Sequence, residues 1–176
     1  MQKNWYIVYT KPKWEKKVSA ALTKRKIESF LPFNRKQVTY LRKVKTEQEP
    51  LFPSYVFVNT TETEICKLKF IEGIVSLIFW KGKPAIIPAE EIELIKDFTS
   101  HHQNIALEKT KVNVNEVASA IDGSRYSMTG NVLTIKNTVM KVNLPSIGFT
   151  LTAKVDTENS QPRTISFGEK DLMLQS

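Results

Sequence analysis

Basic side chains in the first third of the chain are the residues whose types and spacing most clearly suggest chemistry. Residues 1–58 hold 13 of the 26 Lys and Arg residues but only 4 of the 18 Asp and Glu residues, a net charge of +9. The whole 176-residue chain carries +8, because residues 59–108 are net acidic. Lysine and arginine bind phosphate groups, so this charge predicts an anionic partner, most simply a nucleic acid.

A helix predicted over residues 13–26 would place many of these charges on one side. At about 100° per residue, apolar residues from Trp14 to Leu22 share one face, and Arg25 extends its charged head from that face. The lysines gather elsewhere on the helix, at Lys13, Lys16, Lys17 and Lys24. Two interpretations stay open from the residues alone: a face that contacts phosphate, and a face that is only solvated.

Residues 35–45 predict a long, exposed hairpin or loop. The stretch alternates poorly and carries five basic residues, with Val38, Tyr40 and Leu41 between them. Basic residues interleaved with an aromatic ring are typical of an arm that faces nucleic acid. The alternative is a surface loop that contacts nothing.

Residues 50–58 combine a turn and a strand. Pro50 and Pro53 exclude a helix, and the next four residues favour a strand. With a period of two, Tyr55 and Phe57 share one face, and valines line the other. Both faces are apolar, so the strand is either buried on both sides or presents an aromatic patch to a partner. The residues by themselves favour the buried strand.

Groups that could support an enzyme are few and have simpler explanations. The carboxylates Glu90 and Glu91 fall in a predicted first helical turn, and His101 and His102 fall at that helix's end, where the helix dipole favours each charge. Cys66, the single cysteine, has no neighbouring base and is expected to be packed. No glycine-rich phosphate loop or zinc spacing is present. We therefore expect no enzymatic activity, no cofactor and no metal.

The order of predicted elements indicates an α+β domain followed by a small β-rich unit. The first hundred residues predict the order β-α-β-β-α-β-β-α, and residues 103–111 are expected to be a linker. Short strands are then expected near 112–121, 128–135, 139–144 and 149–155, with one more near 164–167. Four such strands predict a small β-barrel. No apolar run suggests a signal or a membrane span, so we expect a cytoplasmic protein.

Four motifs in order resemble the N-terminal (NGN-type) domain of NusG-type transcription elongation factors over residues 4–98. They are WYIVYTKPKWEKK, FLPF, EPLFPSYVFV and EGIVSLIFWKGKPAIIPAEEI. Residues 121–132 and Gly148 resemble the KOW domain, an SH3-like β-barrel, although Gly123-Ser124 replaces the usual Gly-Pro pair. The resemblance implies an NGN-type domain at 1–102, in which helices flank an antiparallel sheet. A linker at 103–111 and a KOW-like barrel with a tail at 112–176 would follow.

The resemblance implies a function in transcription elongation. In the family, an apolar pocket docks on the clamp helices of the RNA polymerase β′ subunit and would here involve Tyr9, Tyr55, Phe57 and Leu77. Specialised members also contact the non-template DNA strand. The matching positions are Lys11, Lys24 and Arg25, with Lys13, Lys16 and Lys17 as neighbours. A threonine run that touches the β subunit in other members is reduced here to Thr60, Thr61 and Thr63.

The run from Glu49 to Pro53 and Phe57 resemble the specialised paralogues, RfaH and the antiterminators of polysaccharide gene clusters. Such a factor bridges the polymerase cleft and suppresses pausing and termination on particular operons. In the family the second domain recruits a ribosomal protein or a termination factor, and in RfaH it also refolds as a helical hairpin. The Val/Thr/Asn-rich segment here favours the barrel. The alternative function is a KOW-type RNA- or ribosome-binding protein that does not act on polymerase.

Overall fold

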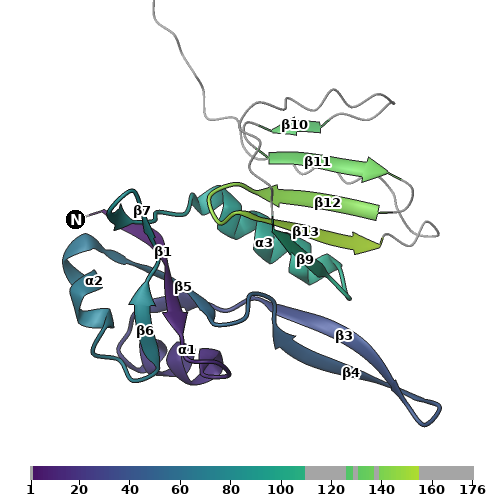
Figure 1. Cartoon of the computed structure of the whole chain (residues 1–176), viewed down its shortest axis with the longest axis horizontal. Coiled ribbons are helices and arrows are strands. Elements are labelled where there is room, and N and C mark those ends of the chain that lie inside the picture. The colour runs from purple at the N-terminus through teal and green to yellow at the C-terminus, as the bar shows by residue number, and fades with distance from the viewer. Residues whose placement is uncertain (1, 110–125, 129–130, 137–138, 155–176) are drawn as a thin grey trace, which may run out of the picture.

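The computed structural model describes residues 2–109, 126–128, 131–136 and 139–154, which form two larger antiparallel sheets, two two-stranded hairpins and three helices (Figure 1). The first part runs β1 (Lys3–Thr10), α1 (Glu15–Lys24), β2 (Glu28–Phe30), β3 (Phe33–Tyr40), β4 (Lys43–Pro50), β5 (Tyr55–Thr61), α2 (Glu62–Leu68), β6 (Ile74–Leu77), β7 (Phe79–Trp80), β8 (Lys83–Pro84) and α3 (Ala89–His101). The second part runs β9 (Ala106–Lys109), β10 (Tyr126–Met128), β11 (Asn131–Lys136), β12 (Val139–Leu144) and β13 (Phe149–Lys154).

The N-terminal sheet has four strands in the order β2-β5-β1-β6, and every pair is antiparallel. Strand β1 lies at its centre, with Ile7 opposite Phe57 and Val8 opposite Val56. Side chains alternate between the two faces, so one face carries the valines and the other carries Ile7 and Phe57. This arrangement confirms the predicted α+β domain with an antiparallel sheet flanked by helices.

Two apolar clusters lie on the two faces of this sheet. The smaller cluster packs α1 and α2 against the valine face, around Val18, Leu22 and Leu68. The larger cluster combines the other face with α3, whose Ile92, Ile95 and Phe98 are buried. It continues without a break into β12 and β13, through four buried side chains: Val142, Leu144, Leu151 and Ala153. The two sheets therefore share one core.

The C-terminal sheet has five antiparallel strands in the order β10-β11-β12-β13-β9. Its edge strand β9 lies inside the segment that we expected to be a linker, because the extended chain after α3 pairs its backbone with β13. The strand expected near 128–135 is instead two strands, β10 and β11. The strands expected near 112–121 and 164–167 lie outside the described residues, so the closed barrel and the domain boundaries stay predictions.

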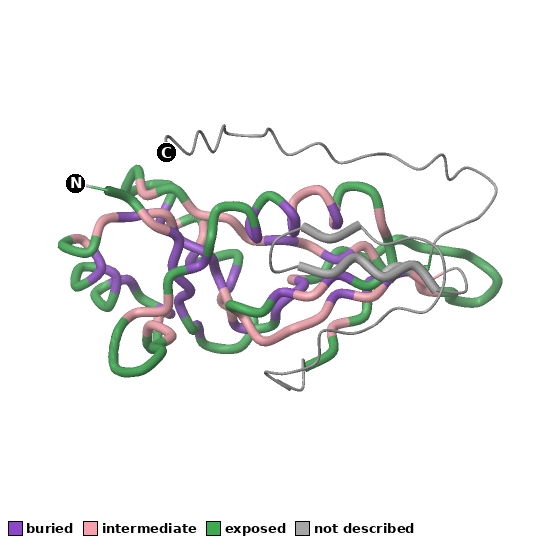
Figure 2. Tube along the Cα trace, turned by 90° about the horizontal axis from the view of Figure 1, so that it is seen from above, coloured by how far each residue is buried: buried purple, intermediate pink, exposed green. Residues whose placement is uncertain are grey.

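Strands β3 and β4 form the long hairpin that the sequence predicts. They pair from Phe33 opposite Pro50 to Tyr40 opposite Lys43. The hairpin projects beyond both sheets (Figure 1), and its outer half is exposed (Figure 2). Among the described residues, no helix has the length and apolar character that crossing a membrane requires.

Candidate functional site

Tyr9 and Tyr55 form an aromatic pair on neighbouring strands. They are directly opposite each other where β1 and β5 pair, and their ring centroids lie 6.0 Å apart at an interplanar angle of 72°. An edge-to-face arrangement at this distance is favourable. Tyr9 is 39% exposed and Tyr55 is half-buried. Two of the four residues predicted to form an apolar docking pocket therefore lie together near the surface.

Phe57 and Leu77 do not join that surface. Phe57 is fully buried, with its ring centroid 5.6 Å from that of Phe52 and 6.0 Å from that of Phe30. Leu77 is opposite Val8, so it lies on the other face of the sheet and packs against the cluster under α1. This corrects the predicted pocket: Phe57 supports the aromatic pair from the core, and Leu77 is separated from the pair by the sheet.

A buried carboxylate that sequence reasoning missed holds the turn before Tyr55. Glu15, in the first turn of α1, accepts a hydrogen bond of 2.7 Å from the backbone N–H of Ser54. Ser54 has a φ of 64°, and its carbonyl accepts a 2.8 Å bond from the N–H of Thr10. These bonds determine where β5 begins and hence where Tyr55 lies. The only sequence signal was an acidic residue at a helix start.

Aromatic contacts join the pair to the C-terminal sheet. The ring of Phe149, at the start of β13, lies 6.3 Å from Tyr55 and 5.8 Å from Phe52, measured between centroids. A cavity of about 290 Å³ remains between the two parts. It is lined by Tyr9, Phe52, Pro53, Ser54, Tyr55, Leu107 and Phe149. Sequence periodicity carries no information about this contact, because its members are distant along the chain.

A polar contact also connects α3 to the C-terminal sheet, at the turn between β12 and β13. The Oε1 atom of Glu91 accepts hydrogen bonds from the Ser146 hydroxyl at 2.7 Å and from the Ser146 N–H at 3.3 Å. Burial raises the pKa of the Glu91 carboxyl above its usual 4.5; the bonds from Ser146 oppose this, and the charge of Glu90 adds to it. The other oxygen, Oε2, is buried and has no partner among the described residues.

The predicted DNA-binding residues are all exposed but form two groups. Around the start of α1, the Nζ atoms of Lys11 and Lys17 lie 5.3 and 4.6 Å from the centre of the Trp14 ring. We call Lys11, Lys13, Lys16 and Lys17 the basic patch. Lys24 and Arg25 lie at the other end of the helix, about 12 Å further along its axis. The structure therefore gathers four of the six residues.

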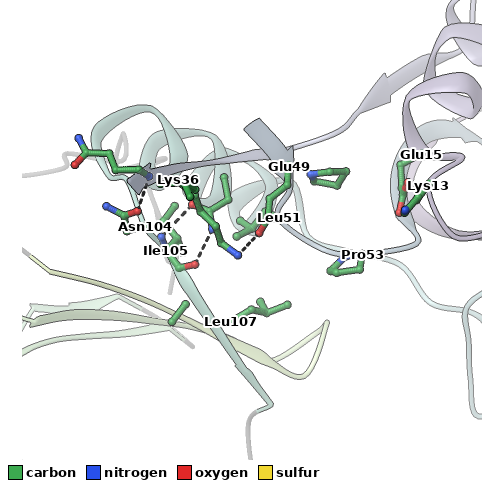
Figure 3. A pocket seen from close by; sticks show the side chains of 14 residues that line it. Lys13, Glu15, Lys36, Glu49, Leu51, Pro53, Asn104, Ile105 and Leu107 are labelled. Atoms are coloured by element: carbon green, nitrogen blue, oxygen red, sulfur yellow. Dashed lines mark hydrogen bonds and ion pairs between the residues drawn. The ribbon is translucent and has the colours of Figure 1, made fainter. Parts of the chain in front are cut away.

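A groove of about 820 Å³ lies beside the basic patch, between the start of α1, the base of the hairpin and residues 104–107 (Figure 3). Lys13 and Lys36 line it together with the acidic Glu15 and Glu49. Lys36 forms an ion pair with Glu49 across the hairpin. Since both signs of charge are present and partly paired, the groove itself has no strong preference for an anion.

The cysteine and the two histidines considered as catalytic or metal-binding groups form no such site in the described residues. Cys66 is exposed, which corrects the expectation that it is packed. The Nδ1 atoms of His101 and His102 lie 2.9 and 3.0 Å from carbonyl oxygens of the last turn of α3. Among the described residues, no three His, Cys, Asp or Glu side chains are grouped so that they could hold a metal ion.

The threonines at the positions of the family's β-subunit contact form hydrogen bonds within the protein. Thr60 is buried and donates a 3.0 Å hydrogen bond to Glu64, and Thr61 donates to the same carboxylate at 3.3 Å. Thr61 occupies the N-cap position of α2 without a side-chain bond to a helix N–H. The hydrogen bonds from Thr60 and Thr61 lower the pKa of Glu64.

Comparison with known proteins identifies the family. The model of a family described as "Transcription termination factor nusG" matches residues 3–96, more than half of the chain. The chain belongs to the NusG family. NusG-family proteins are transcription factors and not enzymes. The motifs quoted above therefore identified the family correctly, although the specialised subtype goes beyond this finding.

Two curated NusG proteins show how far the similarity extends. The chain is 26% identical over 164 residues to the transcription termination/antitermination protein NusG of Bacillus subtilis (strain 168), covering 82% of this chain and 88% of that protein. It is also 26% identical over 142 residues to NusG of Rickettsia typhi, covering 74% and 73%. A solved structure described as "Domain interaction in Thermotoga maritima NusG" covers 89% of this chain and 99% of that one, at 19% identity and a TM-score of 0.48.

Proposed function

We propose that this chain is a transcription elongation and antitermination factor that docks on the clamp helices of the RNA polymerase β′ subunit. Membership of the NusG family supports this function. The observation that carries it is the aromatic pair, since Tyr9 and Tyr55 present aromatic surface at the ends of the paired strands β1 and β5. Aromatic side chains in such positions commonly anchor protein interfaces.

The basic patch would add a second contact, with the non-template DNA strand. Glu15 supports this role indirectly, because its hydrogen bond to Ser54 fixes the start of α1 relative to the aromatic pair. A factor held at both places spans the polymerase cleft and makes opening of the clamp more costly. The apolar anchor supplies affinity that salt does not screen, and the lysines supply salt-dependent attraction.

The finer assignments also belong to this proposal. The run from Glu49 to Pro53 supports a specialised paralogue that acts on particular operons, such as polysaccharide clusters. The C-terminal sheet would recruit a ribosomal protein or a termination factor. Because Phe149 covers part of the Tyr55 ring, a partner that takes the whole face of Tyr55 has to displace this sheet.

Capture of core RNA polymerase by the full chain tests the proposal. We compare the wild type with a Tyr9→Ser/Tyr55→Ser variant and with Phe70→Ser, which removes a more exposed aromatic ring beyond the end of α2. We expect the double variant to lose polymerase and the control to retain it. In transcription through a terminator in vitro, the wild type and the control should increase read-through, and the double variant should not.

Two outcomes would contradict polymerase docking. One is that the wild type captures no polymerase while binding RNA or ribosomes, which would favour the alternative KOW-type function. The other is that the double variant captures as much polymerase as the control. A Lys13→Glu/Lys16→Glu/Lys17→Glu variant tests the DNA contact separately, through a shallower salt dependence of DNA binding.

A further inference from the structure

The outer half of the β3–β4 hairpin has two chemically different faces. Residues directly opposite each other in a sheet share a face, so Tyr40 lies with Lys43, and Val38 lies with Lys45. Tyr40 is 57% exposed. We call these four residues the tip face. It carries two lysines, a tyrosine and a valine, and no acidic residue.

The opposite face of the same segment carries no charge. It pairs Thr39 with Val44 and Gln37 with Thr46. The charge is therefore concentrated on one side of the ribbon and is not a general property of an exposed hairpin. Such one-sided charge next to an aromatic ring is complementary to a polyanion that also carries flat rings.

The basic side chains at the tip are available for a partner. The acidic residues of the hairpin, Glu47 and Glu49, lie towards its base, where Glu49 pairs with Lys36. Within the part of the chain that the structure describes, no carboxylate lies at ion-pair distance from Arg42, Lys43 or Lys45. The tip thus keeps a net positive charge that the fold does not neutralise.

The turn of the hairpin is built from residues that do not favour its conformation. Leu41 and Arg42 have φ angles of 44° and 68°, in the left-handed region where Asn-Gly is preferred. Leu41 is also 99% exposed, so packing does not explain its presence. A large apolar and a basic side chain held at a strained, exposed tip indicate a role outside the fold.

The base of the hairpin is fixed to the body of the protein. The buried side chain of Asn34 donates to the carbonyl of Ile105 at 2.8 Å and accepts from its N–H at 3.0 Å. The guanidinium of Arg35 donates to the carbonyls of Thr99 and Ser100 at the end of α3. The hairpin therefore presents its tip face in a set direction and loses little freedom when it binds.

We propose that the tip face is a second nucleic-acid-binding site, separate from the basic patch, that takes a single strand. Tyr40 stacks on an unpaired base, and Lys43, Lys45 and Arg42 contact the flanking phosphates. A single strand fits because its bases are free to stack, whereas a duplex hides them. The eight residues of each strand separate tip and base by about 25 Å, so the two sites can hold one strand at separate points.

Fluorescence anisotropy of the full chain with a labelled oligo(dT) strand, in the absence of polymerase, tests this site independently of polymerase docking. We compare Lys43→Gln/Lys45→Gln with Lys81→Gln/Lys83→Gln, which removes the same charge from the β7–β8 hairpin. The tip variant should bind less tightly than the control, and its salt slope should fall by about 1.4 because two phosphate contacts are lost. Circular dichroism checks that both variants fold.

Substitution of Tyr40 tests stacking. Tyr40→Ala should weaken binding by about five-fold or more, and Tyr40→Phe should restore it, since the ring and not the hydroxyl is required. Equal binding by the tip and control variants would overturn the proposal, as would an absence of binding by the wild type. A duplex of the same length that competes better than the single strand would overturn the single-strand assignment, and an RNA strand that competes as well as oligo(dT) would support it.

Discussion

The Glu15 carboxylate and the Ser54 backbone N–H form a 2.7 Å hydrogen bond between the first helix and the turn that begins β5. Glu15 is adjacent to Trp14, whose ring lies under two lysines of the basic patch. Ser54 is adjacent to Tyr55 of the aromatic pair. One buried bond therefore keeps the two candidate contact surfaces in a constant relation to each other.

Replacement of Glu15 should remove this hydrogen bond and lower the stability of the protein. Glu15→Ala leaves the Ser54 N–H buried without an acceptor, and we expect the free energy of unfolding to fall by about 1–3 kcal/mol. Glu62→Ala is the control, because Glu62 occupies the first turn of α2 but is exposed. Chemical denaturation measures both. Equal stability of Glu15→Ala and the control would show that the bond contributes nothing to the fold.

Substitution of Phe57 should mainly lower stability, whereas substitution of Tyr9 should mainly lower polymerase capture. Phe57→Ala removes a fully buried ring, and we expect a loss of about 3–5 kcal/mol in unfolding free energy. Tyr9→Ser removes a partly exposed ring, so its main effect should be on polymerase capture, with a much smaller loss of stability. Thermal unfolding together with capture assays separates the two. A Phe57→Ala variant as stable as the wild type would contradict the core role assigned to Phe57.

Gly73 and Gly82 allow crowding to be separated from backbone strain. Both have positive φ, 96° and 78°. A Cβ at Gly73 would lie 2.6 Å from the Trp14 ring and 2.9 Å from Val18, whereas a Cβ at Gly82 meets nothing within 4 Å. We expect Gly73→Ala to cost about 1–3 kcal/mol more than Gly82→Ala, because only the former displaces packed atoms. Equal melting temperatures of the two variants would contradict the close approach of Trp14.

The Glu91 carboxyl should make stability depend on pH. Its pKa is raised by burial, so the stability that its protonated form contributes is fully present below about pH 4.5 and is lost as the pH rises through the folded-state pKa. Glu91→Gln stays neutral, so its melting temperature relative to the wild type should rise across that window. Glu72→Gln, at an exposed position before β6, serves as the control. A constant difference between Glu91→Gln and the wild type at every pH would contradict this.

Several features of the candidate site could be predicted from local patterns. Alternation placed Tyr55 and Phe57 on the same face of a strand, and the order of motifs identified the NusG family over the first hundred residues. The exposed hairpin at residues 35–45 was one of the two forms, hairpin or loop, that its basic residues predicted. These predictions succeed because side-chain direction in a strand depends only on the period of two.

Other features depend on distant residues. Strand β6 pairs with β1 so that Leu77 is opposite Val8, which places Leu77 on the valine face. A change of one residue in such pairing would reverse every side chain of the strand. Strand β9 formed where a linker was expected, since the exposed edge of β13 supplies backbone partners for it. No local pattern encodes either pairing.

The amino-acid sequence by itself determined the charge of the N-terminal segment, the order of its helices and strands, and the family. Only the tertiary structure decided which aromatic residue reaches solvent. Phe57 is covered by Phe30 and Phe52, while Tyr55 has Tyr9 on one side and Phe149 on the other. The physical reason is that exposure depends on what packs against a face, and those atoms come from segments far away along the chain.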